Sequence, residues 1–154
     1  MPDKGIRWFT DTIPHLLTVL TGALVMFSCS IWFGIAYIVV VILGMLWFWG
    51  AICTACRAYG SRSCPSGYGM ISSRLFKRTS GDFRRAFKYH IFSVAVQWFF
   101  PLLAVPFCLY LRFSWLTLVL YGMFIVIAFV YLPFASKGKG CSRCPQRGEC
   151  PWKR

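Results

Sequence analysis

The longest uncharged stretch of the sequence runs from Thr12 to Cys56 and contains no Lys, Arg, Asp or Glu. A helix needs only about 20 apolar residues to cross a bilayer, so this stretch is long enough for two crossings. Two more uncharged stretches, 89–111 and 113–136, are each long enough for one crossing. The composition, 58% hydrophobic and 14% charged, is too apolar for a soluble domain. The sequence therefore predicts an integral membrane protein with four crossings.

We expect an all-α fold that forms a single membrane domain over residues 1–154, with a turn between the first two helices near Ser28, Cys29, Ser30 and Gly34. The four predicted transmembrane helices cover residues 13–30, 31–51, 91–110 and 113–134. A cleaved signal peptide is the alternative for the N-terminus, because basic residues precede an apolar segment. The apolar run is too long for a signal peptide, and no convincing cleavage site follows it.

The basic residues of the chain, 17 in total, lie before the first predicted span, between the second and third, and after the fourth, with Arg112 as the one exception. Because basic residues beside spans stay in the cytoplasm, both termini and the central loop are expected on the cytoplasmic side of a multi-pass plasma-membrane protein. The net charge of +13 is then an orientation signal, and no nucleic-acid recognition motif accompanies it. Anionic membrane lipids are the expected partners.

Six of the eight cysteines form two similar triplets in the cysteine-rich segments 53–65 and 141–151. The triplets are Cys53, Cys56 and Cys64 in the loop, and Cys141, Cys144 and Cys150 in the tail. In each, a Cys-x-x-Cys pair is followed by a glycine and then by a Cys-Pro dipeptide. A Cys-x-x-Cys turn directs two sulfurs to one metal, and a Cys-Pro dipeptide closes the cluster motif of bacterial ferredoxins. An even number of spans places both triplets at the same face, where they can meet in one metal site.

Three kinds of cysteine site remain open. Disulfides are disfavoured in the reducing cytoplasm and become attractive only if the orientation is reversed. Zinc needs four ligands, which the two Cys-x-x-Cys pairs would supply while leaving Cys64 and Cys150 unexplained. An iron–sulfur cluster, most simply 4Fe-4S, is favoured by the repeated Cys-Pro closures, although six thiols exceed the four that one cluster needs. The remaining cysteines, Cys29 and Cys108, lie in or next to spans and are expected to be packing residues.

This arrangement resembles the polytopic membrane electron-transfer proteins of the NapH and NosR families, in which Cys-x-x-x-Cys-Pro motifs sit at the membrane surface. The residues that carry the resemblance are Cys53, Cys56, Cys64-Pro65, Cys141, Cys144-Pro145 and Cys150-Pro151. The resemblance implies electron transfer between a quinol and a cytoplasmic or membrane partner.

The two histidines, His15 and His90, lie at the predicted cytoplasmic ends of the first and third spans. They are candidates for haem ligands or for the proton acceptor of a quinone site, because ionisable groups within spans are often functional. The alternative is that both are interfacial histidines in contact with water. No carboxylate pair, hydrolase triad or phosphate-binding loop is present, which argues against a hydrolase.

The central loop also contains a basic and apolar stretch, 69–78, which predicts a short interfacial helix. Its apolar face, formed by Ile71, Leu75 and Phe76, is expected to lie on lipid or on a partner subunit. Ser80 or Asp82 is expected to cap the following helix.

The expected function is that of a small membrane subunit or accessory protein of a larger redox complex, which carries electrons through an iron–sulfur cluster or anchors a catalytic partner. Whether it is an enzyme stays open, and a non-catalytic subunit of a membrane oxidoreductase is favoured over an enzyme that acts alone. The alternative is a membrane scaffold or assembly factor without redox activity, in which zinc clamps the loop to the tail.

Overall fold

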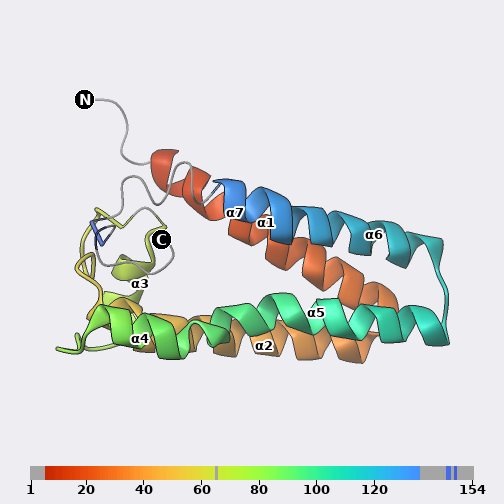
Figure 1. Ribbon diagram of the computed structural model, residues 1–154, viewed down its shortest axis with the longest axis horizontal. Coiled ribbons are helices and arrows are strands. Elements are labelled where there is room, and N and C mark those ends of the chain that lie inside the picture. The colour runs from red at the N-terminus through yellow and green to blue at the C-terminus, as the bar shows by residue number, and fades with distance from the viewer. Residues whose placement is uncertain (1–5, 65, 136–144, 147, 149–154) are drawn as a thin grey trace.

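A computed structural model describes the chain over residues 6–64, 66–135, 145, 146 and 148. The described residues are helical and include no strand (Figure 1). Four helical segments are long and apolar enough to cross a membrane, so the predicted all-α class with four such helices is confirmed. The four segments are α1 (Ile6–Cys29), α2 (Ile31–Ala51), α5 (Phe92–Leu111), and the continuous run of α6 (Trp115–Ile125), η2 (Val126–Tyr131) and α7 (Leu132–Ala135). Shorter helices between α2 and α5 are η1 (Cys53–Ala55), α3 (Tyr68–Leu75) and α4 (Phe83–His90).

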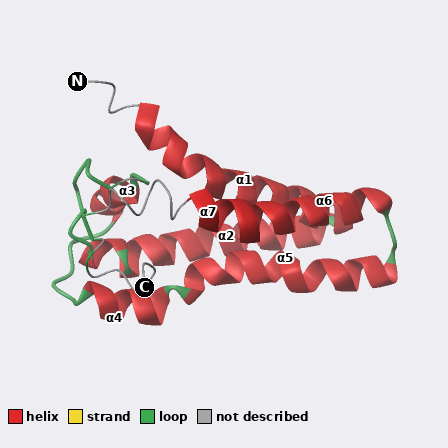
Figure 2. Ribbon diagram, turned by 45° about the horizontal axis from the view of Figure 1, so that its top comes forward, coloured by secondary structure: helices red, strands yellow, loops and turns green. Residues whose placement is uncertain are grey.

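The long helices form an antiparallel bundle in which α1 packs against α2, α5 and α6 (Figures 1 and 2). Its small core consists of six fully buried side chains: Val25, Met26, Tyr37, Val105, Phe124 and Ala128. Many large apolar side chains instead face outward, among them Trp32, Leu103 and Trp115, each more than 70% exposed. An apolar surface of this extent is rare on a soluble monomer and suits contact with lipid.

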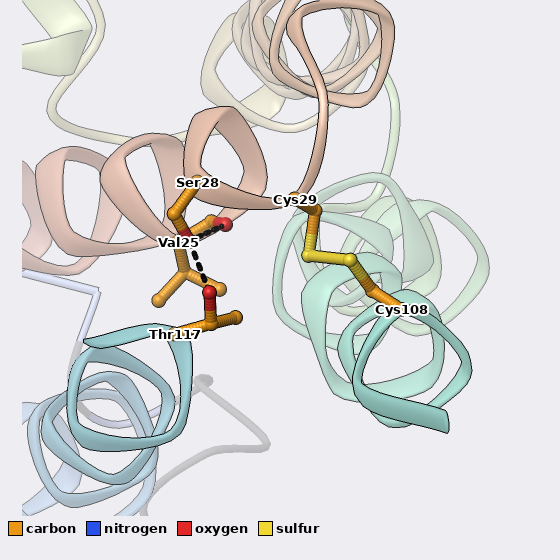
Figure 3. Close-up of a disulfide and its surroundings, with 5 residues drawn as sticks. All are labelled: Val25, Ser28, Cys29, Cys108 and Thr117. Carbon is orange, nitrogen blue, oxygen red and sulfur yellow. Dashed lines mark hydrogen bonds between the residues drawn. A yellow bond between two sulfur atoms is a disulfide. The ribbon is translucent and has the colours of Figure 1, made fainter. Parts of the chain in front are cut away.

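The turn between α1 and α2 is a single extended residue, Ser30, whose N–H donates to the Met26 carbonyl at 3.1 Å. The turn is tight because Gly34 lacks a side chain: a Cβ there would overlap the ring of Phe27. Beside this turn, Ser28 Oγ lies 3.1 Å from Thr117 Oγ1 and so ties α1 to α6 (Figure 3).

Cys29 and Cys108 form a disulfide, with Cα atoms 5.9 Å apart, so the expectation that they are packing residues is wrong (Figure 3). The reason is topological. The first and third spans of a bundle run in the same direction, so residues near their ends lie at the same level. Cys29 is the last residue of α1 and Cys108 lies in the last turn of α5, which places the two sulfurs together.

The fourth long helix changes to a wide π-helical turn over η2 before it continues as α7. Pro133 lies just after this turn. A proline inside a helix lacks an N–H and crowds the carbonyl four residues earlier, which here belongs to Phe129 within η2. The wider turn relieves this crowding, which accounts for its position.

The helix predicted within 69–78 exists as α3, and it packs on α2 through a residue that the sequence did not single out. Ser72 is fully buried, and its hydroxyl donates to the Trp49 carbonyl at 2.8 Å, so α3 packs on the end of α2 through a polar contact. Phe76 packs near Gly50 of α2, and only Leu75 of the expected apolar face is largely exposed, at 56%. The next helix, α4, is capped by Asp82, whose Oδ1 accepts from the Arg84 N–H at 3.0 Å, as the sequence predicted.

Candidate functional site

The cysteine loop (residues 53–64) begins where α2 ends. The 3₁₀ turn η1 reverses the chain, and the Thr54 hydroxyl, which is buried, donates to the Gly50 carbonyl at 2.7 Å. Cys53 and Cys64 are free thiols; Cys53 is buried, whereas Cys56 and Cys64 are partly exposed. The turn thus holds Cys53 at the end of a membrane helix and leaves the other two thiols accessible.

Glycines fold this loop back onto α3. Gly60 and Gly67 both have φ of 69°, a left-handed conformation that side chains disfavour. The Gly60 N–H donates to the Gly69 carbonyl at 3.0 Å, and a Cβ on Gly69 would overlap the carbonyl oxygen of Ala58. The backbone around Gly60 therefore curls as the spacer glycine of the motif predicted.

Tyr68, the first residue of α3, is an aromatic side chain next to the thiols of Cys53 and Cys64. Its ring lies 6.0 Å from that of Phe48, 6.1 Å from that of Trp49 and 6.3 Å from that of His15, measured between centroids. Burial raises the pKa of the Tyr68 hydroxyl, and the neighbouring thiols of Cys53 and Cys64 raise it further. Tyr68 therefore keeps its proton at neutral pH and joins α1, α2 and the cysteine loop at one end of the bundle.

Cys56 accepts a hydrogen bond at its sulfur from the Ala58 N–H, with an N to S distance of 3.5 Å. A donor aimed at sulfur favours the thiolate, which is the form that binds metals. The neighbouring Arg57 N–H donates to Gln146 Oε1 of the tail at 3.0 Å. Gln146 is only 2% exposed, so the tail is docked on the cysteine loop at this point.

The tail cysteines, Cys141, Cys144 and Cys150, lie outside the described residues. Among the residues that are described, no group of three or more His, Cys, Asp or Glu side chains is arranged to hold a metal ion. The three loop thiols are neighbours, since that of Cys53 interacts electrostatically with the other two, but they do not form a closed ligand set. Three thiols are also one short of a closed zinc site or of a 4Fe-4S cluster held by cysteine alone.

The two candidate histidines have different surroundings. His15 of α1 packs edge-on against Tyr68 and so belongs to the cysteine end of the bundle. His90, at the end of α4, accepts a hydrogen bond at Nδ1 from the Trp47 indole N–H at 3.2 Å. Their different neighbours favour separate roles over a shared one.

Comparisons with protein family models, with curated proteins and with solved structures found no match. Neither a family nor a relative therefore assigns a role to the cysteine loop.

Two residues of this site were missed in the sequence. Tyr68 carries a weak signal, because it stands between Gly67 and Gly69, where the chain approaches its neighbours closely. Gln146 carries none, since a polar residue in a basic tail is ordinarily solvated.

Proposed function

We propose that this chain is a small integral membrane redox protein, a subunit or accessory protein of a larger complex, whose loop and tail cysteines together hold an iron–sulfur cluster. The observation that carries the proposal is the hydrogen bond from the Arg57 N–H to Gln146. Arg57 directly follows Cys56, and Gln146 lies in the sequence between Cys144 and Cys150. The contact supports a joint site, because it joins the loop motif to a residue that stands between two of the tail cysteines in the sequence.

The donor chemistry supports a metal site. The loop supplies three thiols, so a fourth from the tail would complete the four that a 4Fe-4S cluster needs. The Ala58 N–H at the Cys56 sulfur is the kind of donor that stabilises a ligating thiolate and tunes the potential of a cluster. When bound, such a cluster supplies one-electron transfer. Tyr68 lies next to the thiols of Cys53 and Cys64, and its ring packs against that of Trp49.

The disulfide supports the proposed orientation independently of the charges. Disulfides persist in oxidising compartments, whereas free thiols are maintained in the cytoplasm. Cys29 and Cys108 lie at the end of the bundle that carries Arg112, and the free thiols of Cys53 and Cys64 lie at the opposite end, with the basic residues of the central loop. In the proposed plasma-membrane topology, the cysteine loop and both termini face the cytoplasm.

Anaerobic purification tests the proposed cluster. We expect a brown protein with broad visible absorption, iron and sulfide in similar amounts, and a paramagnetic signal after reduction. Cys56→Ser should remove most of the iron, while the control variant Cys29→Ser/Cys108→Ser, altered at the other end of the bundle, should retain it. A colourless protein with bound zinc would replace the redox role by that of a zinc-clamped scaffold, and a protein without either metal would refute both.

A further inference from the structure

Residues 74–88, here called the basic segment, carry a dense group of positive charges. They comprise the end of α3, the residues between α3 and α4, and most of α4. The six basic side chains of the segment are all exposed: Arg74, Lys77, Arg78, Arg84, Arg85 and Lys88. The one acidic residue of the segment is Asp82, and its carboxylate accepts the Arg84 N–H at 3.0 Å as the cap of α4. The basic segment therefore presents a positive surface that its own acid does little to neutralise.

Helix length places α4 at the depth of lipid headgroups. The helical run of α4 and α5 covers Phe83–Leu111, 29 residues, and Figure 1 shows the two helices in line. At 1.5 Å per residue this run is about 43 Å long, about 13 Å more than the hydrocarbon core, which is about 30 Å thick. The 20 residues of α5 alone span about 30 Å, the thickness of the hydrocarbon core. The remaining part, α4, therefore starts at the edge of the core and passes through the headgroup layer on that side.

Aromatic side chains mark the same boundary. Trp47 is 54% exposed and Tyr89 is 60% exposed, and the Trp47 indole bonds to His90 at the junction of α4 and α5. Exposed tryptophan and tyrosine collect at the level where hydrocarbon meets headgroups. The Arg85 guanidinium lies 6.0 Å from the centre of the Tyr89 ring, a cation–π distance that holds this charge at that level.

We propose that the basic segment is a binding surface for the phosphodiester headgroups of anionic phospholipids. Its charge is complementary to these headgroups, and its depth is that of their phosphates. The inference rests on the membrane insertion in the proposed function, but it does not depend on a metal.

The basic segment is also hydrogen-bonded to the cysteine loop. The Thr79 N–H donates to the Thr54 carbonyl at 3.3 Å, and the Tyr59 hydroxyl donates to the Phe76 carbonyl at 2.6 Å. A lipid that holds the basic segment in place therefore also steadies the loop that carries Cys56. Bound anionic lipid is expected to slow the reaction of the loop thiols with maleimide.

Native mass spectrometry of the full chain in a neutral detergent tests this proposal. The protein is titrated with phosphatidylglycerol, with phosphatidylcholine of the same acyl chains, and with inorganic phosphate. Phosphatidylglycerol should bind at least about tenfold more tightly than phosphatidylcholine, since each basic side chain near an anionic surface contributes about fivefold. Inorganic phosphate should not compete. The preference should be strongly reduced in Arg84→Gln/Arg85→Gln/Lys88→Gln and kept in the control Arg112→Gln, at the other end of the bundle.

Equal binding of the two lipids, or an unchanged preference in the triple variant, would overturn the proposal, and competition by free phosphate would indicate a site for a soluble anion. If the triple variant does not fold, two further measurements decide. Arg84→Lys/Arg85→Lys keeps the charge and should keep the preference. In the unaltered protein the preference should fall as salt rises from 0.1 to 1 M, because the Debye length shrinks from about 10 to about 3 Å. A preference independent of salt would overturn the proposal. Loss of metal in the Cys56→Ser variant has no bearing on these outcomes.

Discussion

Two buried glutamines show how one residue type has opposite effects in one chain. Gln146, 2% exposed, accepts a hydrogen bond from the Arg57 N–H, so its side-chain oxygen takes the place of a water molecule as the acceptor for this backbone group. Gln97 of α5 is fully buried, yet neither its amide oxygen nor its amide nitrogen has a hydrogen-bond partner among the described residues. A buried polar group is stabilising when it is paired and costly when it is not.

The same substitution at these two positions is expected to act in opposite directions. Gln146→Leu leaves the Arg57 N–H without its partner, which should cost about 1–3 kcal/mol, and should release the tail to proteolysis. Gln97→Leu removes two unpaired polar atoms from within a membrane helix and should leave stability unchanged or raise it. Thermal unfolding of the purified protein in detergent measures both. A Gln97→Leu variant that unfolds well below the unaltered protein would show that this amide has a partner in the membrane.

At the scale of the helices, α3 shows how a hydrophobic pattern can identify an element and miss its main contact. The pattern singled out Ile71, Leu75 and Phe76 as a face for lipid or a partner subunit, whereas the contact that the structure shows is that of Ser72 with α2. The end of α2 offers the carbonyl of Trp49 to the Ser72 hydroxyl, which makes a small polar residue the best contact there.

The contact between α3 and α2 gives the next prediction. Ser72→Ala removes the bond to the Trp49 carbonyl and should lower stability by about 1 kcal/mol, with faster proteolysis of the cysteine loop. Leu75→Ser, one turn away on the exposed side, should leave the rate of loop proteolysis unchanged in detergent. Limited proteolysis followed on gels compares the two variants. Equal sensitivity of both would mean that the loop is held by the apolar face, as the sequence pattern had suggested.

The sequence predicts the helices better than it predicts the contacts between them. The bounds of α2 coincide with the predicted segment 31–51, because the length of an unbroken apolar run sets the length of the helix. Helix α1 begins at Ile6, seven residues before the predicted span at 13, because the helix continues beyond its apolar part, which starts at Thr12. Predicting the disulfide from the sequence would have needed one further step, a comparison of the depths in the bundle at which Cys29 and Cys108 lie. The docking of Gln146 depends on the shape of a folded loop, which no local pattern encodes.

For the whole molecule, the two ends of the bundle carry sulfur in different oxidation states. One end holds the Cys29–Cys108 disulfide, and the other holds the free thiols of Cys53 and Cys64. The basic residues differ between the same two ends: Arg112 lies at the disulfide end, and the basic residues of the central loop lie at the other end. Two independent properties, redox state and charge, thus favour one orientation in the membrane.

This orientation can be measured with a membrane-impermeant maleimide. In intact cells, Cys56 and Cys64 should be protected, whereas in inverted membrane vesicles they should react. Cys29 and Cys108 should react only after reduction, and from the outer side. A loop that is labelled in intact cells would reverse the orientation, and disulfides would then become the leading explanation for the six cysteines of the loop and tail.

Removal of the tail tests whether the bundle end and the tail form one site. Ending the chain after Ala135 leaves all four long helices in place but removes the residues that include Gln146 and the three tail cysteines. Because the loop alone offers three thiols, the shortened protein should lose its metal and its loop thiols should react faster with maleimide. Metal ligation of this kind contributes folding free energy, so the loop should also become more sensitive to protease. The matched comparison is the full-length Gln146→Leu variant, which keeps every cysteine and should retain part of the metal. If the shortened protein keeps as much iron or zinc as the full chain, the loop cysteines form a complete site with a ligand from elsewhere, and the joint site is refuted.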